Sequence, residues 1–220
     1  MNDVVGRRPL KVRNVELSRR FARWLSQKNV TPNQISMASL GFAILAAGCL
    51  LAIPRVEGGV VWIPAVLAAV FIQCRLLCNL FDGMVAVEGG KSTPSGELFN
   101  DIPDRIADPL ILIAAGHATQ VMPWSWTLGW AAALGAVLTA YVRTVAASIG
   151  APIDFSGPMA KQQRMALLTF ACMVTAVEPL LWERGWALLV ALAVIVLGCA
   201  VTVVRRARAA YVALEGKSDD

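Results

Sequence analysis

Charged residues are scarce in this sequence, and their scarcity excludes a soluble globular domain. Asp, Glu, Lys and Arg make up 16% of the 220 residues, whereas 57% are apolar. Soluble domains usually carry about 25% charged residues. The composition instead predicts an all-α integral membrane protein with little chain left for a soluble part.

Soft metal ligands are also few. The chain contains one histidine, His117, and five cysteines that form no CxxC pair. All five cysteines fall in apolar segments, where a thiol packs as a small apolar group. We therefore predict no redox or metal chemistry at the cysteines, and we expect His117 to lie at the membrane interface.

Targeting and repeat signals are missing too. The first ~30 residues contain no apolar core with a cleavage site, so we expect no removable signal peptide. There is no internal repeat and no long linker, which favours one membrane domain over residues 1–220. Nucleic acid is not an expected partner, because the net charge of +5 is explained by attraction to anionic membrane lipid and by topology control.

Six apolar segments approach the ~20 residues that a bilayer requires, and they predict a six-transmembrane-helix bundle over residues 31–205. Thr31, Pro32 and Gln34 form a capping box that starts the first span. Residues 206–220 are expected to form a cytoplasmic tail. The expected spans are residues 32–53, 60–82, 98–120, 125–149, 159–177 and 186–204.

Residues 1–30 are expected to form a cytoplasmic segment with an N-terminal interfacial amphipathic helix. Leu17, Phe21, Trp24 and Leu25 recur at helical spacing on one side, and arginines occupy the other side.

Basic and aromatic residues predict the orientation. Of the 20 Lys and Arg residues, only Arg55 and Arg184 fall at expected outer ends, and Arg75, Arg105 and Arg143 fall within spans. The expected outer ends also hold all but one of the tryptophans. Both termini are therefore expected on the cytoplasmic side of the inner membrane of a bacterium.

Acidic residues concentrate in one hairpin, "NLFDGMVAVEGGKSTPSGELFNDIPDRIAD". On a helical projection, the second and third spans each present one polar face within about 60°. Thr93 and Pro94 are suited to start the third span, so the two faces meet at the cytoplasmic end. The faces comprise Arg75, Asn79 and Asp82 on the second span, and Glu97, Asn100, Asp101, Asp104 and Asp108 on the third.

Carboxylates this close within a membrane need a compensating cation, since each costs at least about 2.5–3.5 kcal/mol on insertion scales. Oxygen ligands without His or Cys favour Mg²⁺ or Mn²⁺, and Mg²⁺ commonly works with a phosphate substrate. The structural alternative to a metal site is that these polar residues only join the two helices by hydrogen bonds. Gly83, Ala86 and Gly96 leave room for a flat nucleotide, or serve close helix packing.

The hairpin resembles the CDP-alcohol phosphotransferase family. That family carries D-x2-D-G-x2-A-R-x8-G-x3-D-x3-D, and every gap is kept here. The matching positions are Asn79, Asp82, Gly83, Ala86, Val87, Gly96, Asn100 and Asp104. The resemblance extends to the "TPN" entry and the six expected spans, so it covers most of the chain.

The resemblance implies transfer of a phosphatidyl group from CDP-diacylglycerol to a small alcohol, phosphorylated or not, with release of CMP, in phospholipid biosynthesis. Metal at Asn79, Asp82, Asn100 and Asp104 would hold the diphosphate, and Asp104 would deprotonate the acceptor. The family's first and third Asp are Asn here, and its Arg is Val87. We predict that Asp101, next to Asn100, joins the metal site and supplies one missing charge.

Basic residues on later spans suit a phosphate-bearing acceptor. Lys161 and Arg164 lie one turn apart, and Arg143 lies within the fourth span; topology anchoring and structural ion pairing are the alternatives. Similar depth on facing helices predicts an ion pair between Arg75 and Asp108, with Arg143 as the competing partner.

Two other functions stay open. A degenerate member of the family would bind nucleotide or lipid without turnover, whereas an ion-coupled carrier would need an inverted repeat and a midplane site that the sequence lacks. The sequence leaves the oligomeric state open, a homodimer included.

Overall fold

The computed structural model describes residues 16–88 and 96–216. This part does not include the expected cap residues Thr93 and Pro94 or the basic residues Arg7, Arg8, Lys11 and Arg13. The helices are α1 (Glu16–Gln27), α2 (Pro32–Ala52), α3 (Trp62–Glu88), α4 (Gly96–Thr119), α5 (Ser125–Ser148), α6 (Lys161–Val177) and α7 (Trp186–Glu215). The all-α prediction is confirmed.

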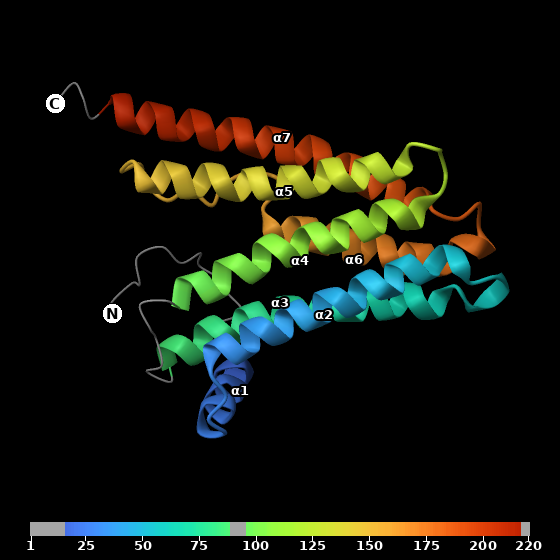
Figure 1. The fold of residues 1–220 in the computed structure, drawn as a ribbon, viewed down its shortest axis with the longest axis horizontal. Helices are drawn as coiled ribbons and strands as arrows, with labels where there is room; N and C mark the ends of the chain where they lie inside the picture. The colour runs from blue at the N-terminus through green and yellow to red at the C-terminus, as the bar shows by residue number, and fades with distance from the viewer. Residues whose placement is uncertain (1–15, 89–95, 217–220) are drawn as a thin grey trace.

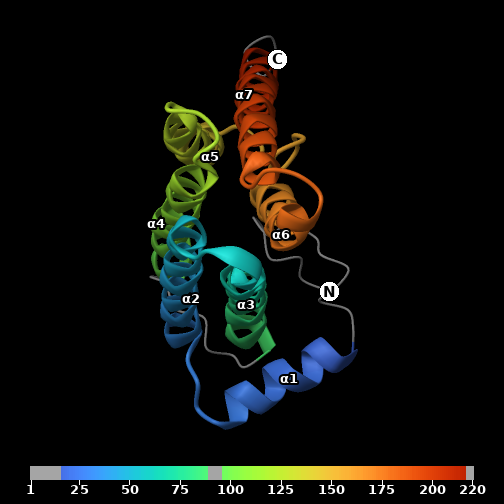
Figure 2. The same cartoon turned by 90° about the vertical axis from the view of Figure 1, so that its right-hand side faces the viewer.

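Helices α2 to α7 run along one common direction and form a closed ring (Figures 1 and 2). Around the ring, the neighbours are α2, α3, α6, α7, α5 and α4, and α4 packs back on α2. The inner faces are lined by small and branched apolar residues, such as Ala68, Ile72, Ala115 and Leu192. Small residues let helix backbones approach closely where lipid supplies no hydrophobic drive.

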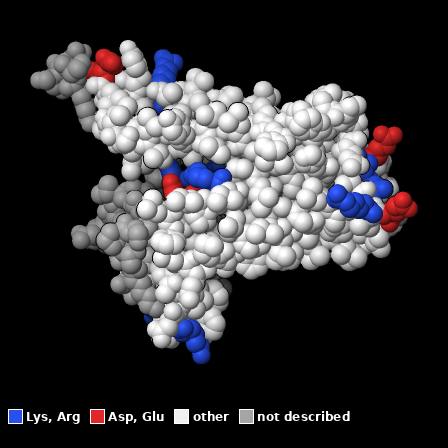
Figure 3. All heavy atoms as spheres, in the orientation of Figure 1, with Lys and Arg blue, Asp and Glu red and all other residues white. Residues whose placement is uncertain are grey.

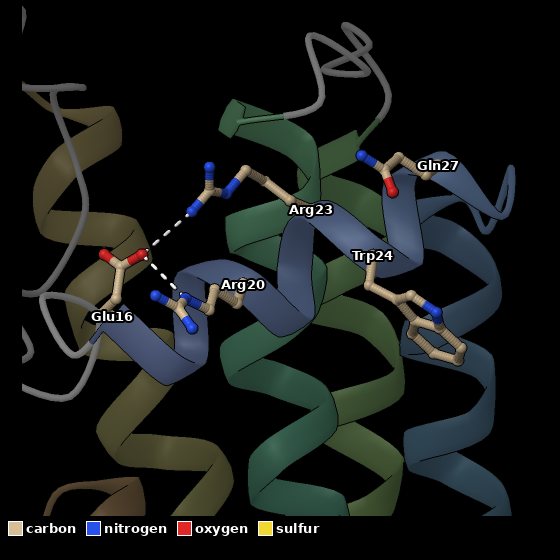
Figure 4. A pocket seen from close by; sticks show the side chains of 5 residues that line it. All are labelled: Glu16, Arg20, Arg23, Trp24 and Gln27. Atoms are coloured by element: carbon tan, nitrogen blue, oxygen red, sulfur yellow. Dashed lines mark hydrogen bonds and ion pairs between the residues drawn. The ribbon is translucent and has the colours of Figure 1, made fainter.

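Helix α1 lies across one end of the ring, against α3 (Figure 2). Its Ala22 is fully buried, and the ring of Phe21 lies 4.7 Å from that of Phe81 on α3. On the other side, Arg20 and Arg23 pair with Glu16 (Figure 4). The expected amphipathic helix is present, because an apolar side packs on the ring while a charged side faces outward.

Among the described residues, four helices are long and apolar enough to cross a bilayer, namely α2, α3, α5 and α7. Helix α4 carries several charged residues in its first half, and α6 has 17 residues, which is short for a span. Helix α7 also differs from the expectation, since it does not end at Val204 but continues to Glu215. The tail expected from residue 206 is therefore helical over most of its length.

The start of α2 agrees with the predicted capping box. The Gln34 amide donates to Thr31 Oγ1 at 3.3 Å, and the Thr31 amide donates to Gln34 Oε1 at 2.9 Å. Pro32 occupies the first turn, where its missing N–H has no partner to lose.

Helices α4 and α5 touch backbone to backbone at Gly116 and Gly129. A Cβ built on Gly116 would lie 2.7 Å from Gly129 Cα, which is closer than real contacts allow. We expect Gly116→Ala to lower the free energy of unfolding by about 1–3 kcal/mol, because the helices have to separate. Reversible unfolding in mixed micelles measures this change.

Gly48→Ala is the matched control, since a Cβ built there meets nothing within 4 Å. It should leave stability unchanged or slightly raised, because Ala is the better helix former. Equal effects from the two substitutions would contradict the close contact between α4 and α5.

Candidate active site

Asp104 lies at the centre of a polar cluster inside the ring and is 6% exposed. Its Oδ1 accepts hydrogen bonds from Arg75 Nη2 at 3.0 Å and from Asn79 Nδ2 at 2.8 Å. Its Oδ2 accepts one from Lys161 Nζ. Asp104 thus joins α4 both to its neighbour α3 and to α6, whose Lys161 is 57 residues away along the chain.

Asp108 forms a second layer one helical turn further along α4. Arg75 Nη2 lies 2.6 Å from Asp108 Oδ1, and Arg164 Nη2 lies 3.0 Å from Asp108 Oδ2. The predicted ion pair between Arg75 and Asp108 is confirmed. Arg143, the competing partner in the prediction, pairs with Asp101 instead. Arg164 also donates to Thr139 Oγ1 and to the Met159 carbonyl, so it binds α6 to α5.

Two serines of α2 hold the α3 part of the motif. Ser36 Oγ donates to Asp82 Oδ2 at 2.8 Å, and Ser39 Oγ donates to Asn79 Oδ1 at 2.9 Å. The Gly83 amide donates to Asp82 Oδ1. As Asn79 lies, its oxygen is directed to Ser39 and its nitrogen to Asp104. The sequence reading missed both serines, although two buried hydroxyls one turn apart in an apolar span were a usable signal.

The segment before α6 is attached to α7, and this attachment positions Lys161. Thr202 Oγ1 accepts a hydrogen bond from the Met159 amide at 3.1 Å. Arg206 donates to the carbonyls of Ser156 and Thr139. Arg206 is 5% exposed, so it is a structural residue of the ring, although the sequence predicted that it begins a cytoplasmic tail.

Asp101 lies at the rim of the cluster, with 47% of its side chain exposed. It pairs with Arg105 at 3.3 Å and with Arg143 at 3.5 Å, and Arg143 lies 5.3 Å above the ring of Phe155. Figure 3 shows acidic and basic side chains together in a recess between α4 and α5. Asn100 is exposed on α4.

The three residues with little side-chain bulk lie at the same end of the ring. Gly83 and Ala86 are half-buried on α3, beyond Asp82, and Gly96 is the first residue of α4. Figure 1 shows that this end is opposite to the starts of α3, α5 and α7, where Trp62, Trp126 and Trp186 are exposed. Trp24 on α1 is exposed at the same end as the site.

Charges within the buried cluster balance one another. Asp82, Asp104 and Asp108 face Arg75, Arg164 and Lys161, and all but Lys161 are at least nine-tenths buried. The numbers of hydrogen-bond donors and acceptors in the cluster are not balanced. Within the described residues, Nε and Nη1 of Arg75 and Nε of Arg164 have no hydrogen-bond acceptor, whereas one buried acceptor, Asp108 Oδ1, has only the ion-pair contact with Arg75 at 2.6 Å. The cluster therefore has donors to spare, which suits an additional anion.

The described residues include ligands of the kind that a divalent cation prefers. Asp82 and Asp104 offer carboxylate oxygens from two helices, and Mg²⁺ or Mn²⁺ prefers such ligands with water and phosphate completing the shell. Within the part of the chain that the structure describes, no three Asp, Glu, His or Cys residues lie close enough to hold an ion by themselves. Substrate oxygens would have to supply the remaining ligands.

The ring of helices is similar to that of a solved membrane enzyme. Phosphatidylinositol phosphate synthase (PgsA1) of Mycobacterium tuberculosis with CDP-DAG bound matches with a TM-score of 0.71 and 18% identity, over 90% of this chain and 94% of that chain. Its complex with manganese and citrate matches with a TM-score of 0.70 and 19% identity, over 88% of each chain. No family model matches the sequence. The likeness defines the class as an all-α membrane protein with the PgsA1 fold.

Two curated relatives extend the comparison to sequence. Inner membrane protein YnbA of Escherichia coli (strain K12) is 27% identical over 161 residues, which cover 71% of this chain and 73% of the relative. A bifunctional IPC transferase and DIPP synthase of Rubrobacter xylanophilus is 32% identical over 161 residues, but the match spans only 34% of that protein. With the fold and the motif spacing, these relatives identify the chain as a member of the CDP-alcohol phosphotransferase family.

Proposed function

We propose that the protein transfers a phosphatidyl group from CDP-diacylglycerol to a small alcohol and releases CMP. The observation that carries this proposal is the pair Asp82 and Asp104. They are kept at the family's spacing and buried on two helices, and Asp104 contacts the cations Arg75 and Lys161. PgsA1, which shares the fold, was solved with CDP-DAG bound.

The residues divide the work. Asp82 and Asp104, with Asn79 and Asp101, would hold Mg²⁺ or Mn²⁺, which supplies charge for a diphosphate. Asp104 takes the proton of the acceptor hydroxyl, whose oxygen then forms the new bond to phosphorus as the bond to CMP breaks. Gly83, Ala86 and Gly96 leave room for the nucleotide. Lys161, with Arg164 and Arg143 nearby, attracts phosphate groups of either substrate.

The proposal includes a membrane arrangement. We place six helices, α2 to α7, across the inner membrane of a bacterium, because α4 and α6 complete the ring and bury their charged residues inside it. The site then opens to the cytoplasm, at the end of the ring opposite to Trp62, Trp126 and Trp186. YnbA is an inner membrane protein, which supports this location.

Release of CMP tests the function. Purified protein is incubated with CDP-diacylglycerol, Mg²⁺ or Mn²⁺ and a panel of alcohols, including phosphorylated ones, and CMP and lipid products are measured. Acceptor-dependent CMP release supports the proposal. Binding of CDP-diacylglycerol without CMP release favours a binding protein instead, a role that the exposed Asn100 and the Asn79 oxygen directed to Ser39 would explain.

Asp101 provides a sharper test of the metal site. We expect Asp101→Asn to lower metal-dependent CMP release at least tenfold, roughly 1.4 kcal/mol, and to raise the metal concentration needed. Adding Asn100→Asp should restore part of the activity. Arg105→Met is the control, since it breaks an ion pair with Asp101 but leaves the carboxylate, and Arg105 has no assigned role in substrate binding. An equal loss in Arg105→Met, with unchanged metal dependence in Asp101→Asn, would mean that Asp101 acts only through its ion pairs.

A further inference from the structure

We infer that Lys161 is an internal cation that competes with the divalent metal for Asp104, so that metal binds well only together with a diphosphate. The inference rests on the proposed function. It assigns Lys161 a regulatory role at the metal site, beyond a general attraction for phosphate.

The first support is the hydrogen-bonding capacity of Asp104. A carboxylate oxygen has about two lone-pair sites. Those of Oδ1 are taken by Arg75 and Asn79, whereas Oδ2 accepts, among the residues that the structure describes, from Lys161 alone. Oδ2 is thus the oxygen open to a metal ion or a proton, and the Lys161 ammonium already lies on it. A cation that binds there has to displace or repel Lys161.

The second support is the charge balance of the buried cluster. Three carboxylates already face three cations, so a dication alone would leave a positive excess in a site of low polarity. The donors of Arg75 and Arg164 without acceptors also call for an anion. A diphosphate brings the missing negative charge and acceptor oxygens at once.

The third support is the relative freedom of Lys161. Its side chain is 25% exposed, whereas that of Arg75 is fully buried and that of Arg164 is 2% exposed. Lys161 is also the first residue of α6, where only one neighbouring turn restrains it. Of the three cations, Lys161 can leave Asp104 for a phosphate oxygen without unpacking the ring.

The experiment measures binding of Mn²⁺ alone, from the spectroscopic signal of the free ion, to purified protein in detergent. We expect Lys161→Met to bind Mn²⁺ at least about tenfold more tightly than the unchanged protein, because one adjacent positive charge is gone. Lys161→Arg should stay within about threefold of the unchanged protein. Adding CDP, a soluble diphosphate, should tighten Mn²⁺ binding in the unchanged protein more than in Lys161→Met.

Arg208→Met is the control for a general loss of positive charge, since Arg208 is an exposed residue near the C-terminal end of α7. It should change Mn²⁺ affinity less than threefold at moderate salt. Equal or weaker Mn²⁺ binding by Lys161→Met would overturn the inference, even if CMP release is found. Tighter binding by Lys161→Met would sustain it even if no acceptor yields CMP, so the two proposals fail separately.

Discussion

Asp104→Asn is expected to reduce CMP release by at least about a thousandfold. Loss of a general base alone usually lowers the rate by 10²–10⁴. Here the change has a second effect, because an amide nitrogen in place of Oδ2 would direct a donor toward the Lys161 ammonium. Neither proton transfer nor metal binding is possible at that atom. Steady-state CMP release, with the unfolding transition of the same sample, measures the effect.

Glu183→Gln is the matched control. Glu183 is exposed just before α7, at the end of the ring opposite to the cluster (Figure 1). It should keep at least about half of the original rate, because surface substitutions rarely disturb a distant site. Asp82→Asn should match Asp104→Asn in lost activity but respond partly to added metal. A folded Asp104→Asn protein with an unchanged rate would remove the active-site assignment.

Much of the cluster could be predicted because helix periodicity is a local property. The spacing of Asn79, Asp82 and Arg75 places them on one face of α3, and the same holds for Asp104 and Asp108 on α4. Rise per residue then gave the depth of Arg75 and Asp108, and the ion pair followed. None of these steps needed to know how the remaining helices pack.

The rest depended on tertiary contacts that no local pattern contains. Lys161 meets Asp104 only because Thr202 and Arg206 hold the preceding loop against α7. The exposed position of Asn100 and the pairing of Asp101 with Arg143 likewise follow from the packing of α4 on α5. Periodicity predicts which face of its helix a residue occupies. It does not predict which side chain of another helix contacts that face.

Arg75→Met is expected to be the most destabilising substitution in the cluster. Arg75 is fully buried, and its guanidinium is the contact shared by Asp104 and Asp108. Breaking a buried ion pair from one side usually costs about 3–5 kcal/mol, because the remaining charge stays buried without compensation. We expect a loss of free energy of unfolding in that range, measured by reversible unfolding in mixed micelles. Arg20→Met, which breaks an exposed pair with Glu16, should cost less than about 1 kcal/mol.

The double variant Arg75→Met with Asp108→Asn separates charge balance from lost packing. It leaves two carboxylates, Asp82 and Asp104, and two cations, Lys161 and Arg164, so the buried cluster has no net charge, and Arg164 keeps its hydrogen bonds to Thr139 and the Met159 carbonyl. If uncompensated charge is the cause, the double variant should recover at least about 1 kcal/mol relative to Arg75→Met, since neighbouring substitutions in one network are not additive. The effect of Asp108→Asn is also measured by itself. If the double variant is less stable than Arg75→Met by that full effect, Arg75 stabilises the ring by its volume and not by its charge.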